Sequence, residues 1–451
     1  VHAFVVPIRD EEGNPLPGVR VEDDGRKIGL NGVDNGRLWF DGVRIPRENL
    51  LNKYADVTES GVYESPIESR NRRFFTMLGT LVQGRVSVGG GGINASKVAL
   101  SVATKYANKR RQFGEDDKPE ELLLDYGMHQ RRLLPLIART YALHFAQEIL
   151  VGQLHDVFTE TDETGESAES AEDAERLRRT LESRAAGTKA LGTWHASEAI
   201  QECREACGGA GYLSANRFDA LRADTDVFTT FEGDNHVLLQ LVAKGLLTDY
   251  SSGFNDLNQF GMVRFVAELA VETVMERTAV HKLVERIRDV LPGGDDGWDQ
   301  EAGLLDPDYQ LAMFEWREEH MLAGVARRLK RGIDHGMEPA EVFSRCQDHV
   351  IGAARAHVDR LVLQAFVDKC QTLPEGDNKV ALGLLCDLYA LHTIEQDRGW
   401  WMEHGRLSSQ RSKAISREIG DLLRKLRPLA EDLVDAFGVP AELQRAEMLE
   451  R

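Results

Sequence analysis

A single glutamate, Glu232, stands between an apolar run and the start of a helical pattern. The residues before it read "VFTTF", and Gly233, Asp234 and Asn235 follow it directly. A carboxylate among apolar groups has its charged form disfavoured, which suits a general base that works near neutral pH. Gly233 would let a ligand approach the backbone, and Asp234 or Asn235 can cap the next helix. The alternative is a pre-helix acid that the helix dipole favours, and this stretch alone favours that alternative.

Two further stretches carry residue types suited to an anionic cofactor. The stretch "KYANKRRQFG" places Arg110, Gln112 and Phe113 just past a predicted helix. Arginine binds phosphate through paired hydrogen bonds, and phenylalanine offers a face or an edge to a flat ring. The stretch "CGGAGY" places Gly208 and Gly209 in a turn, where the main chain can contact a phosphate or a ring. Taken singly, each stretch has an ordinary alternative. The first can be a common charged helix end, and the second a glycine turn that only ends a helix.

The elements that must position these residues are mainly helical. Residues 1 to about 50 contain short apolar or alternating runs between Gly, Pro, Asn and Asp, which predict strands. From about residue 70, apolar residues recur at helical spacing, and the four glycines at 89–92 lie inside that pattern. Each glycine in a helix costs about 1 kcal/mol against alanine, which is tolerable where another backbone or a ligand must come close. A flexible linker is the alternative for this run.

Further helices are predicted along the rest of the chain. One covers 119–158, with a kink at Pro135, and another covers 177–209 and ends at its glycines. The acidic stretch at 159–175 reads as a solvated loop or helix start. After a break near 249–258, the remaining residues look almost wholly helical. The architecture is therefore a small β segment followed by two helical bundles.

Composition narrows the class of protein. The chain has 451 residues, of which 42% are hydrophobic and 29% charged, as in soluble globular proteins of two or three domains. A formal net charge of −19 argues against bulk nucleic-acid binding but leaves room for a small anionic ligand in a local basic pocket. No apolar run approaches the roughly 20 residues of a membrane span. The start "VHAFVVPIRD" has neither Met nor a signal peptide, which indicates that an N-terminal portion is missing.

Together and in this order, the three stretches resemble the C-terminal half of the FAD-dependent acyl-CoA dehydrogenase and acyl-CoA oxidase superfamily. "RRQFG", "CGGAGY" and "FEGDN" are similar to the family's flavin segment, its Gly-Gly-x-Gly-aromatic loop and its catalytic Glu-Gly pair. "LWFDGVRIPRENLL" is similar to the end of its β domain. The form is closest to the oxidases, which carry an additional C-terminal helical domain. The resemblance implies a mainly α fold with a small β segment. It divides the chain into the end of a β-barrel-like middle domain at 1–60, a bundle that binds FAD and acyl-CoA at 61–252, and the additional helical domain at 253–451.

The resemblance also implies a reaction, the oxidation of a fatty acyl-CoA to a trans-2-enoyl-CoA in fatty-acid β-oxidation. Glu232 would be the catalytic base that removes the α-proton, while the β-hydrogen passes as hydride to flavin N5. Arg85 and Gly233 would lie at the substrate. The residues expected to bind FAD are Arg110, Gln112, Phe113, Gly208, Gly209 and Asp234. No metal is expected.

The expected partners follow from the same resemblance. They are a fatty acyl-CoA, an electron acceptor that is O2 in an oxidase or an electron-transfer flavoprotein in a dehydrogenase, and a second copy of the chain. A homodimer is expected because in this family the "RRQFG" segment reaches the flavin of the neighbouring subunit. Two departures from the dehydrogenases are Glu205, where many have Gln, and Asp234, where many have Thr. A non-catalytic helical scaffold is the alternative from another class. The C-terminus "AEMLER" is not a peroxisomal address, and a bacterial cytoplasm is expected.

Overall fold

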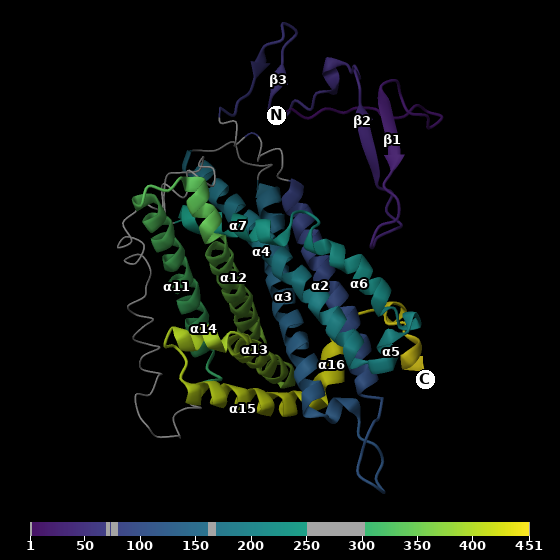
Figure 1. Cartoon of the computed structure of the whole chain (residues 1–451), viewed down its shortest axis with the longest axis vertical. Coiled ribbons are helices and arrows are strands. Elements are labelled where there is room, and N and C mark those ends of the chain that lie inside the picture. Colours follow the sequence, from purple (N-terminus) through teal and green to yellow (C-terminus); the bar gives the residue numbers. More distant parts are fainter. Residues whose placement is uncertain (1, 69–72, 74–79, 161–167, 250–302, 451) are drawn as a thin grey trace.

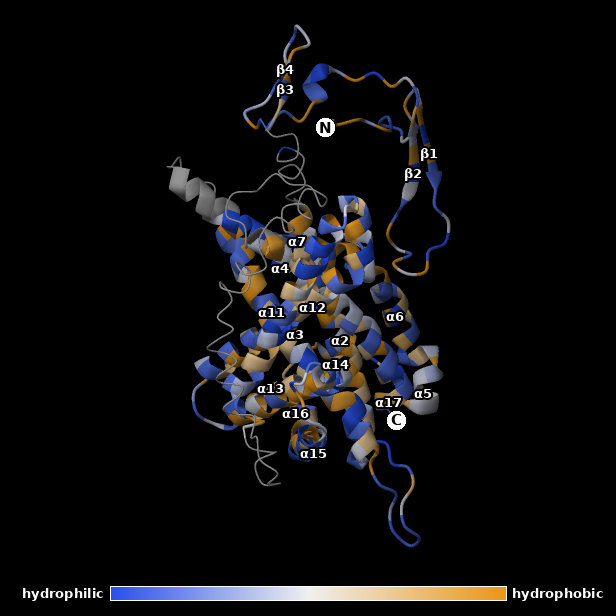
Figure 2. Ribbon diagram, turned by 60° about the vertical axis from the view of Figure 1, so that its left-hand side comes forward, coloured by the Kyte–Doolittle hydropathy of each residue, from blue (hydrophilic) through white to orange (hydrophobic). Residues whose placement is uncertain are grey.

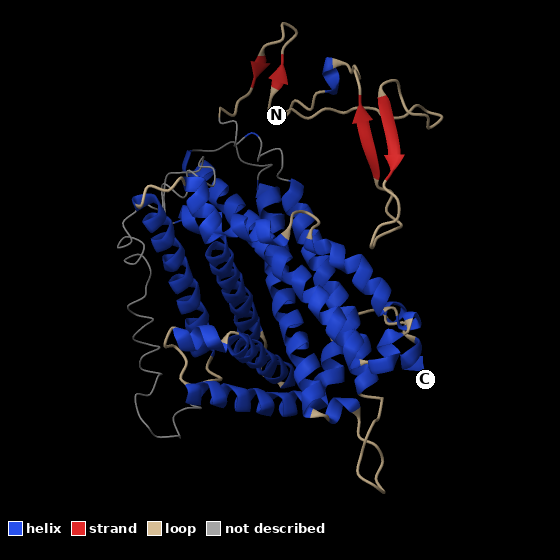
Figure 3. Ribbon diagram, viewed as in Figure 1, coloured by secondary structure: helices blue, strands red, loops and turns tan. Residues whose placement is uncertain are grey.

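Long helices that lie side by side make up most of the described chain, and two small antiparallel strand pairs lie beyond one end of the bundle (Figure 1). The computed structural model describes residues 2–68, 73, 80–160, 168–249 and 303–450. Strands occur only in the N-terminal part of these residues, and the remaining regular structure is helical, with loops between the helices (Figure 3). The predicted fold class, mainly α with a small β segment, is therefore confirmed.

The β segment is smaller than the sequence predicts. Its strands are β1 (Val19–Asp23), β2 (Gly36–Phe40), β3 (Asp56–Val57) and β4 (Tyr63–Glu64), paired β1 with β2 and β3 with β4. The run "HAFVVPI" at 2–8, which reads as a strand in the sequence, forms only a single bridge, between Phe4 and Leu50, so this prediction is wrong. The Val5 N–H donates to the Asn49 carbonyl oxygen and the Leu51 N–H donates to that of Ala3. Asn49 ends the short helix η1 (Arg47–Asn49), so this pairing does not extend into a longer ladder.

The first bundle is built from four long helices and the short elements between them. These are α2 (Thr80–Ala107), η2 (Leu123–Asp125), α3 (Gly127–Glu160), α4 (Ala168–Ala206), α5 (Gly208–Tyr212), η3 (Ser214–Asn216), α6 (Phe218–Asp226), η4 (Val227–Thr229) and α7 (Asn235–Asp249). As predicted, α4 ends just before its glycines. The helix α3 runs continuously past Pro135, so the expected kink does not end it.

The four glycines at 89–92 lie within one uninterrupted helix, α2, so the linker alternative is wrong. A Cβ atom on Gly89 would come within 3.2 Å of the Lys189 Cα atom, and one on Gly92 would lie 3.4 Å from the Gly192 carbonyl oxygen. Both partners belong to α4. The glycines therefore permit α2 and α4 to approach each other backbone to backbone, which is the close contact that the sequence analysis required.

The second bundle follows residues 250–302, which are not among the described residues. Its elements are α11 (Pro307–Asp334), α12 (Pro339–Thr372), α13 (Asp377–Gln396), α14 (Arg398–Glu403), α15 (Ser409–Leu426), η5 (Arg427–Leu429), α16 (Ala430–Asp435), η6 (Ala441–Leu443) and α17 (Glu447–Glu450). The helices predicted within 260–302 lie outside the described residues.

The two bundles share one hydrophobic core. Helix α12 packs against both α3 and α7, and α16 and α17 return to α2. Buried apolar residues form a continuous cluster from Ile93 in α2 to Met448 in α17. The ribbon coloured by hydropathy shows apolar residues along the helices of both bundles (Figure 2). The division into 1–60, 61–252 and 253–451 stays a prediction.

Candidate active site

Glu232 lies in a tight turn between η4 and α7. Its φ is 57° and that of Gly233 is 119°, so both residues adopt the left-handed side of the Ramachandran map. A non-glycine residue there is uncommon and costs free energy, and such residues cluster at functional sites. Asp234 closes the turn, because its Oδ1 accepts hydrogen bonds from the backbone N–H groups of His236 (2.9 Å) and Val237 (3.3 Å). Of the two predicted caps of this helix, Asp234 is therefore the one that caps it.

The carboxyl group of Glu232 lies directly against the start of α2. A Cβ atom on Gly84 would come within 2.5 Å of the Glu232 carboxyl carbon, so only glycine leaves room for the carboxylate at this position. The next residue, Arg85, donates a hydrogen bond from Nε to the Glu232 backbone oxygen at 3.2 Å. Burial lowers the pKa of Arg85, while Glu182 and Glu232 act in the opposite direction. The predicted substrate residue Arg85 thus touches the predicted base.

A buried lysine, Lys189 in α4, which the sequence did not point to, donates hydrogen bonds to the turn. The Nζ of Lys189 donates to the Gly233 carbonyl oxygen at 2.8 Å and to Asn235 Oδ1 at 2.9 Å. The pKa of Lys189 is lowered to about 8, mainly by burial and also by the charge of Arg85, while the carboxylates of Asp234 and Glu232 oppose this shift. The signal in the sequence was a lone lysine in the small, apolar helical stretch "AAGTKALGT".

The predicted flavin residues Arg110, Gln112 and Phe113 lie past the far end of α2, in an extended loop that folds back on itself. The Gln112 N–H donates to the Glu121 carbonyl oxygen at 3.0 Å, and the Glu121 N–H donates to that of Phe113 at 2.8 Å. Phe113 has a φ of 61° and is 69% exposed. The side chain of Arg110 is also exposed. These residues are therefore presented at the surface, available to another molecule.

Gly208 and Gly209 begin α5 and lie at this same end of the bundle, close to Tyr212, which is 84% exposed. The C-terminal helix α17 is hydrogen-bonded to residues next to both the extended loop and α5. The Leu449 carbonyl oxygen accepts from Lys109 Nζ at 2.9 Å, and the Met448 N–H donates to Asn216 Oδ1 at 2.9 Å. Lys109 precedes the extended loop and Asn216 follows α5.

The predicted site residues therefore form two groups at opposite ends of α2. The structure brings Glu232, Gly233, Asp234 and Arg85 together beside the start of the helix. The other five lie at its far end (Figure 1). Gly84 and Ala107 are separated by nearly the whole of α2, which at 1.5 Å per residue is about 35 Å.

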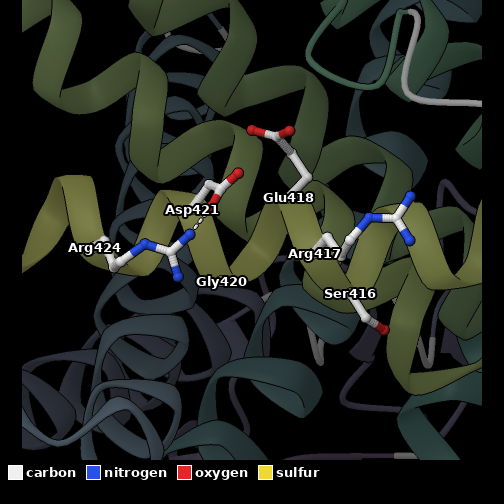
Figure 4. A pocket seen from close by; sticks show the side chains of 6 residues that line it. All are labelled: Ser416, Arg417, Glu418, Gly420, Asp421 and Arg424. Atoms are coloured by element: carbon white, nitrogen blue, oxygen red, sulfur yellow. Dashed lines mark hydrogen bonds and ion pairs between the residues drawn. The ribbon is translucent and has the colours of Figure 1, made fainter. Parts of the chain in front are cut away.

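Other features of the described residues do not offer a second candidate active site. A surface hollow on α15, lined by Ser416, Arg417, Glu418, Gly420, Asp421 and Arg424, contains an ion pair between Arg424 and Asp421 (Figure 4). It lies at the opposite end of the bundle from α7 (Figure 1). Among the described residues, no group of three or more His, Cys, Asp or Glu side chains is placed to hold a metal ion. Nor is any helix in the described ranges both long and apolar enough to cross a membrane.

Comparison with known proteins identifies relatives over the whole chain. Two family models match, "Acyl-CoA oxidase, C-alpha1 domain" at residues 78–247 and "Acyl-CoA oxidase" at residues 306–443. Acyl-coenzyme A oxidase 2 of Arabidopsis thaliana is 38% identical over 99% of this chain and 61% of its own length. The structure of acyl-CoA oxidase 1 from Yarrowia lipolytica matches with a TM-score of 0.83 and 29% identity, over 99% of this chain and 62% of that one.

A third match bears on the cofactor. Acyl-CoA oxidase-1 of Caenorhabditis elegans, solved in complex with FAD and ATP, is 25% identical over 99% of this chain and 61% of its own, with a TM-score of 0.78. The chain thus spans about 60% of the length of these relatives.

The expected bacterial cytoplasmic location is contradicted. The relatives include plant and human enzymes that are named peroxisomal. The expectation rested on the last residues of the chain, which report on one address signal only and carry no information about the rest of the protein. The recognition itself is confirmed, because two acyl-CoA oxidase models match successive helical segments. This chain belongs to the acyl-CoA oxidase superfamily.

Proposed function

We propose that this chain forms the helical part of a flavin enzyme that oxidises a fatty acyl-CoA to a trans-2-enoyl-CoA, with Glu232 as the base. The observation that carries the proposal is the placement of the Glu232 carboxylate. A left-handed turn holds it over Gly84, where the absence of a side chain makes room for it. Strained backbone and a reserved space around one carboxylate are typical of a group positioned for proton transfer.

The backbone of the turn supplies a second group for this reaction. In the part of the chain that the structure describes, the Glu232 N–H has no hydrogen-bond acceptor, although the N–H groups of Phe231 and Gly233 on either side donate to Val227 and Thr230. An α-proton of a thioester is acidic enough to leave only when the thioester oxygen is polarised. The Glu232 N–H is free to donate to that oxygen, and one such donor commonly contributes about 3 kcal/mol to the transition state.

The residues at the far end of α2 fit a flavin dinucleotide. Arg110 offers a guanidinium to the pyrophosphate, Phe113 offers a ring face, and Gly208 has a φ of 55° with nothing within 4 Å of a Cβ atom built on it. FAD, when bound, takes up the hydride that leaves the β-carbon. The chain's own part is to bind the dinucleotide with Arg110, Gln112, Phe113, Gly208 and Gly209, and to remove the α-proton with Glu232.

The distance between the two groups supports a homodimer. Because about 35 Å separates them, one flavin cannot touch both groups of the same chain. In a twofold dimer, the exposed segment of one chain binds the cofactor that lies beside Glu232 of its partner. The names of the relatives favour an oxidase, in which O2 accepts the electrons, over a dehydrogenase.

The test follows the flavin absorbance of the full-length protein anaerobically as a long-chain acyl-CoA is added, for the parent and for Glu232→Gln. The parent should bleach, and the variant should bleach about 10³-fold more slowly, as expected for loss of a general base. Admitting air should then re-oxidise the parent rapidly if it is an oxidase, and slowly if it is a dehydrogenase. Equal bleaching in both proteins would overturn the role of Glu232. A full-length protein without flavin would favour the non-catalytic scaffold.

A further inference from the structure

We propose that Lys189 is a positioning residue, which fixes the backbone of the turn and thereby aims the Glu232 carboxylate. The inference rests on the proposed function and adds a residue to the same site. Lys189 lies in the middle of α4 and is completely buried. Lysine is almost never fully buried unless its ammonium group is paired, because an isolated charge in the interior is strongly disfavoured.

The contacts of Lys189 run to the turn itself. Its Nζ donates to the Gly233 carbonyl oxygen at 2.8 Å and to Asn235 Oδ1 at 2.9 Å. The Asn235 amide nitrogen donates back to α4, to the Ala190 carbonyl oxygen at 3.2 Å and to Thr193 Oγ1 at 3.0 Å. Lys189 and Asn235 thus form one hydrogen-bonded unit that joins the centre of α4 to the first residue of α7.

Two cations therefore hold two successive carbonyl groups of the turn. Arg85 from α2 donates to the Glu232 carbonyl oxygen, and Lys189 from α4 donates to that of Gly233. Hydrogen bonds from charged donors are about twice as strong as those between neutral groups. The left-handed conformation is unfavourable at a non-glycine residue such as Glu232, and these bonds offset that cost. With both carbonyls fixed, the Glu232 side chain and N–H are left for the substrate.

The backbone of Lys189 is closely packed. A Cβ atom on Gly89 would come within 3.2 Å of the Lys189 Cα, so α2 packs closely against the α4 backbone at this point. The charged groups that face its ammonium group are Glu232 and Asp234 in the turn and Arg85 on α2. A side chain without donors at position 189 would leave the Gly233 oxygen and Asn235 Oδ1 without their charged partner. The turn could then relax, and a displacement of about 1 Å in a catalytic group can cost 10²-fold in rate.

The experiment uses the full-length flavin-bound enzyme and measures the anaerobic rate of flavin bleaching by a long-chain acyl-CoA. Lys189→Met should bleach about 10²-fold more slowly than the parent, with flavin content and the dissociation constant for acyl-CoA unchanged within about twofold. Lys189→Arg keeps a charged donor and should recover about tenfold of this loss. The matched control is Lys97→Met, at another buried lysine, 7% exposed in α2, whose Nζ lies 3.2 Å from His144 Nδ1 and not at the turn. It should bleach at the parental rate.

Three results would overturn the proposal. They are a parental rate in Lys189→Met, a loss of flavin or of acyl-CoA affinity that matches the loss in rate, and an equal slowing in Lys97→Met. The last two would show that removing a buried lysine damages the fold in general. Failure of the proposed function gives a different pattern, because Glu232→Gln would then bleach like the parent whatever the lysine variants do.

Discussion

The two ends of α2 serve the same proposed reaction but are built in opposite ways. At its start, the turn at Glu232 is held by partners from α2 and α4, and the carboxylate has a space reserved for it by Gly84. At its far end, Arg110 and Phe113 are exposed, on a loop whose regular contacts are its own backbone hydrogen bonds. The supports of the turn at the first end come from one chain, whereas the second end exposes the side chains that the proposed function assigns to the cofactor.

This contrast shows that the position of the base must be more precise than the positions of the cofactor-binding groups. Proton transfer tolerates little displacement of the base, so its supports are buried hydrogen bonds and close backbone contacts. A dinucleotide can be held by exposed arginine, aromatic and glycine groups, because most of its affinity comes from charge and ring contacts that form on binding. Variants at the two ends should therefore fail in different ways, the first in rate and the second in cofactor affinity.

Among variants that keep Glu232 itself, the largest effect on rate is expected for Gly84→Ala. The new Cβ would lie within 2.5 Å of the Glu232 carboxyl carbon, so the flexible carboxylate must move while the helix stays in place. We expect the anaerobic bleaching rate to fall about 10²-fold, with unfolding by urea changed little. A parental bleaching rate would show that the carboxylate works from another position.

A second effect concerns pH and acts through Lys189. Burial lowers the pKa of this lysine to about 8, from a usual 10.5, so between these values the unfolded chain keeps a proton that the folded chain has released. The free energy of unfolding contributed by this group must therefore rise with pH across that window, by at most about 3 kcal/mol. Urea unfolding of the parent and of Lys189→Met at a series of pH values measures it. If the difference between the two proteins does not change with pH, the lysine titrates at its ordinary value.

A smaller effect is expected at the far end of α2. Arg110→Ala removes a charged donor to the cofactor, and such hydrogen bonds contribute about 1.5–3 kcal/mol, so FAD binding should weaken about tenfold or more. Stability should change by less than about 0.5 kcal/mol because the side chain is exposed. Titration of the apoprotein with FAD measures this. Arg345→Ala, at an exposed arginine paired with Glu341 in α12, is the control and should leave the affinity unchanged. Equal affinity in all three proteins would remove Arg110 from the cofactor site.

The smallest effect contrasts a second helical glycine with Gly84. Gly152 in α3 is exposed, and nothing lies within 4 Å of a Cβ atom built on it. Gly152→Ala should therefore stabilise the protein by about 1 kcal/mol and leave the bleaching rate unchanged, because alanine favours the helix and meets no neighbour. A slower rate in this variant would mean that added helix stiffness, and not the space beside Glu232, explains Gly84→Ala.

Much of the fold follows from sequence patterns that act locally. Helical periodicity and glycine stops predicted α2 and α4, and the cost of glycine in a helix predicted close contact at residues 89–92. The strand predicted at 2–8 and not formed shows the limit, because a strand needs a partner that local pattern does not specify. Lys189 was missed for a similar reason. A lone lysine in a helix is normally a surface residue, and only the tertiary contact with Gly233 reveals its role.

The grouping of the site residues was also beyond local pattern. The order of motifs along the chain predicted their identity, but not which lie at the same end of the bundle. The length of a single helix separates Gly84 from the loop after Ala107, and contacts through α17 bring the segment after α5 to the same end as that loop.

The most direct test of this account is complementation between two inactive chains. Glu232→Gln and Arg110→Glu should each be inactive as homodimers, the first through loss of the base and the second through charge repulsion of the cofactor. In a mixed dimer, intact Glu232 of one chain and intact Arg110 of the other meet at one of the two sites. We predict that the mixed dimer regains about half of the parental activity, as twofold symmetry requires. A mixed dimer without activity would show that each site draws both residues from one chain, and would contradict the division of labour between the two ends of α2.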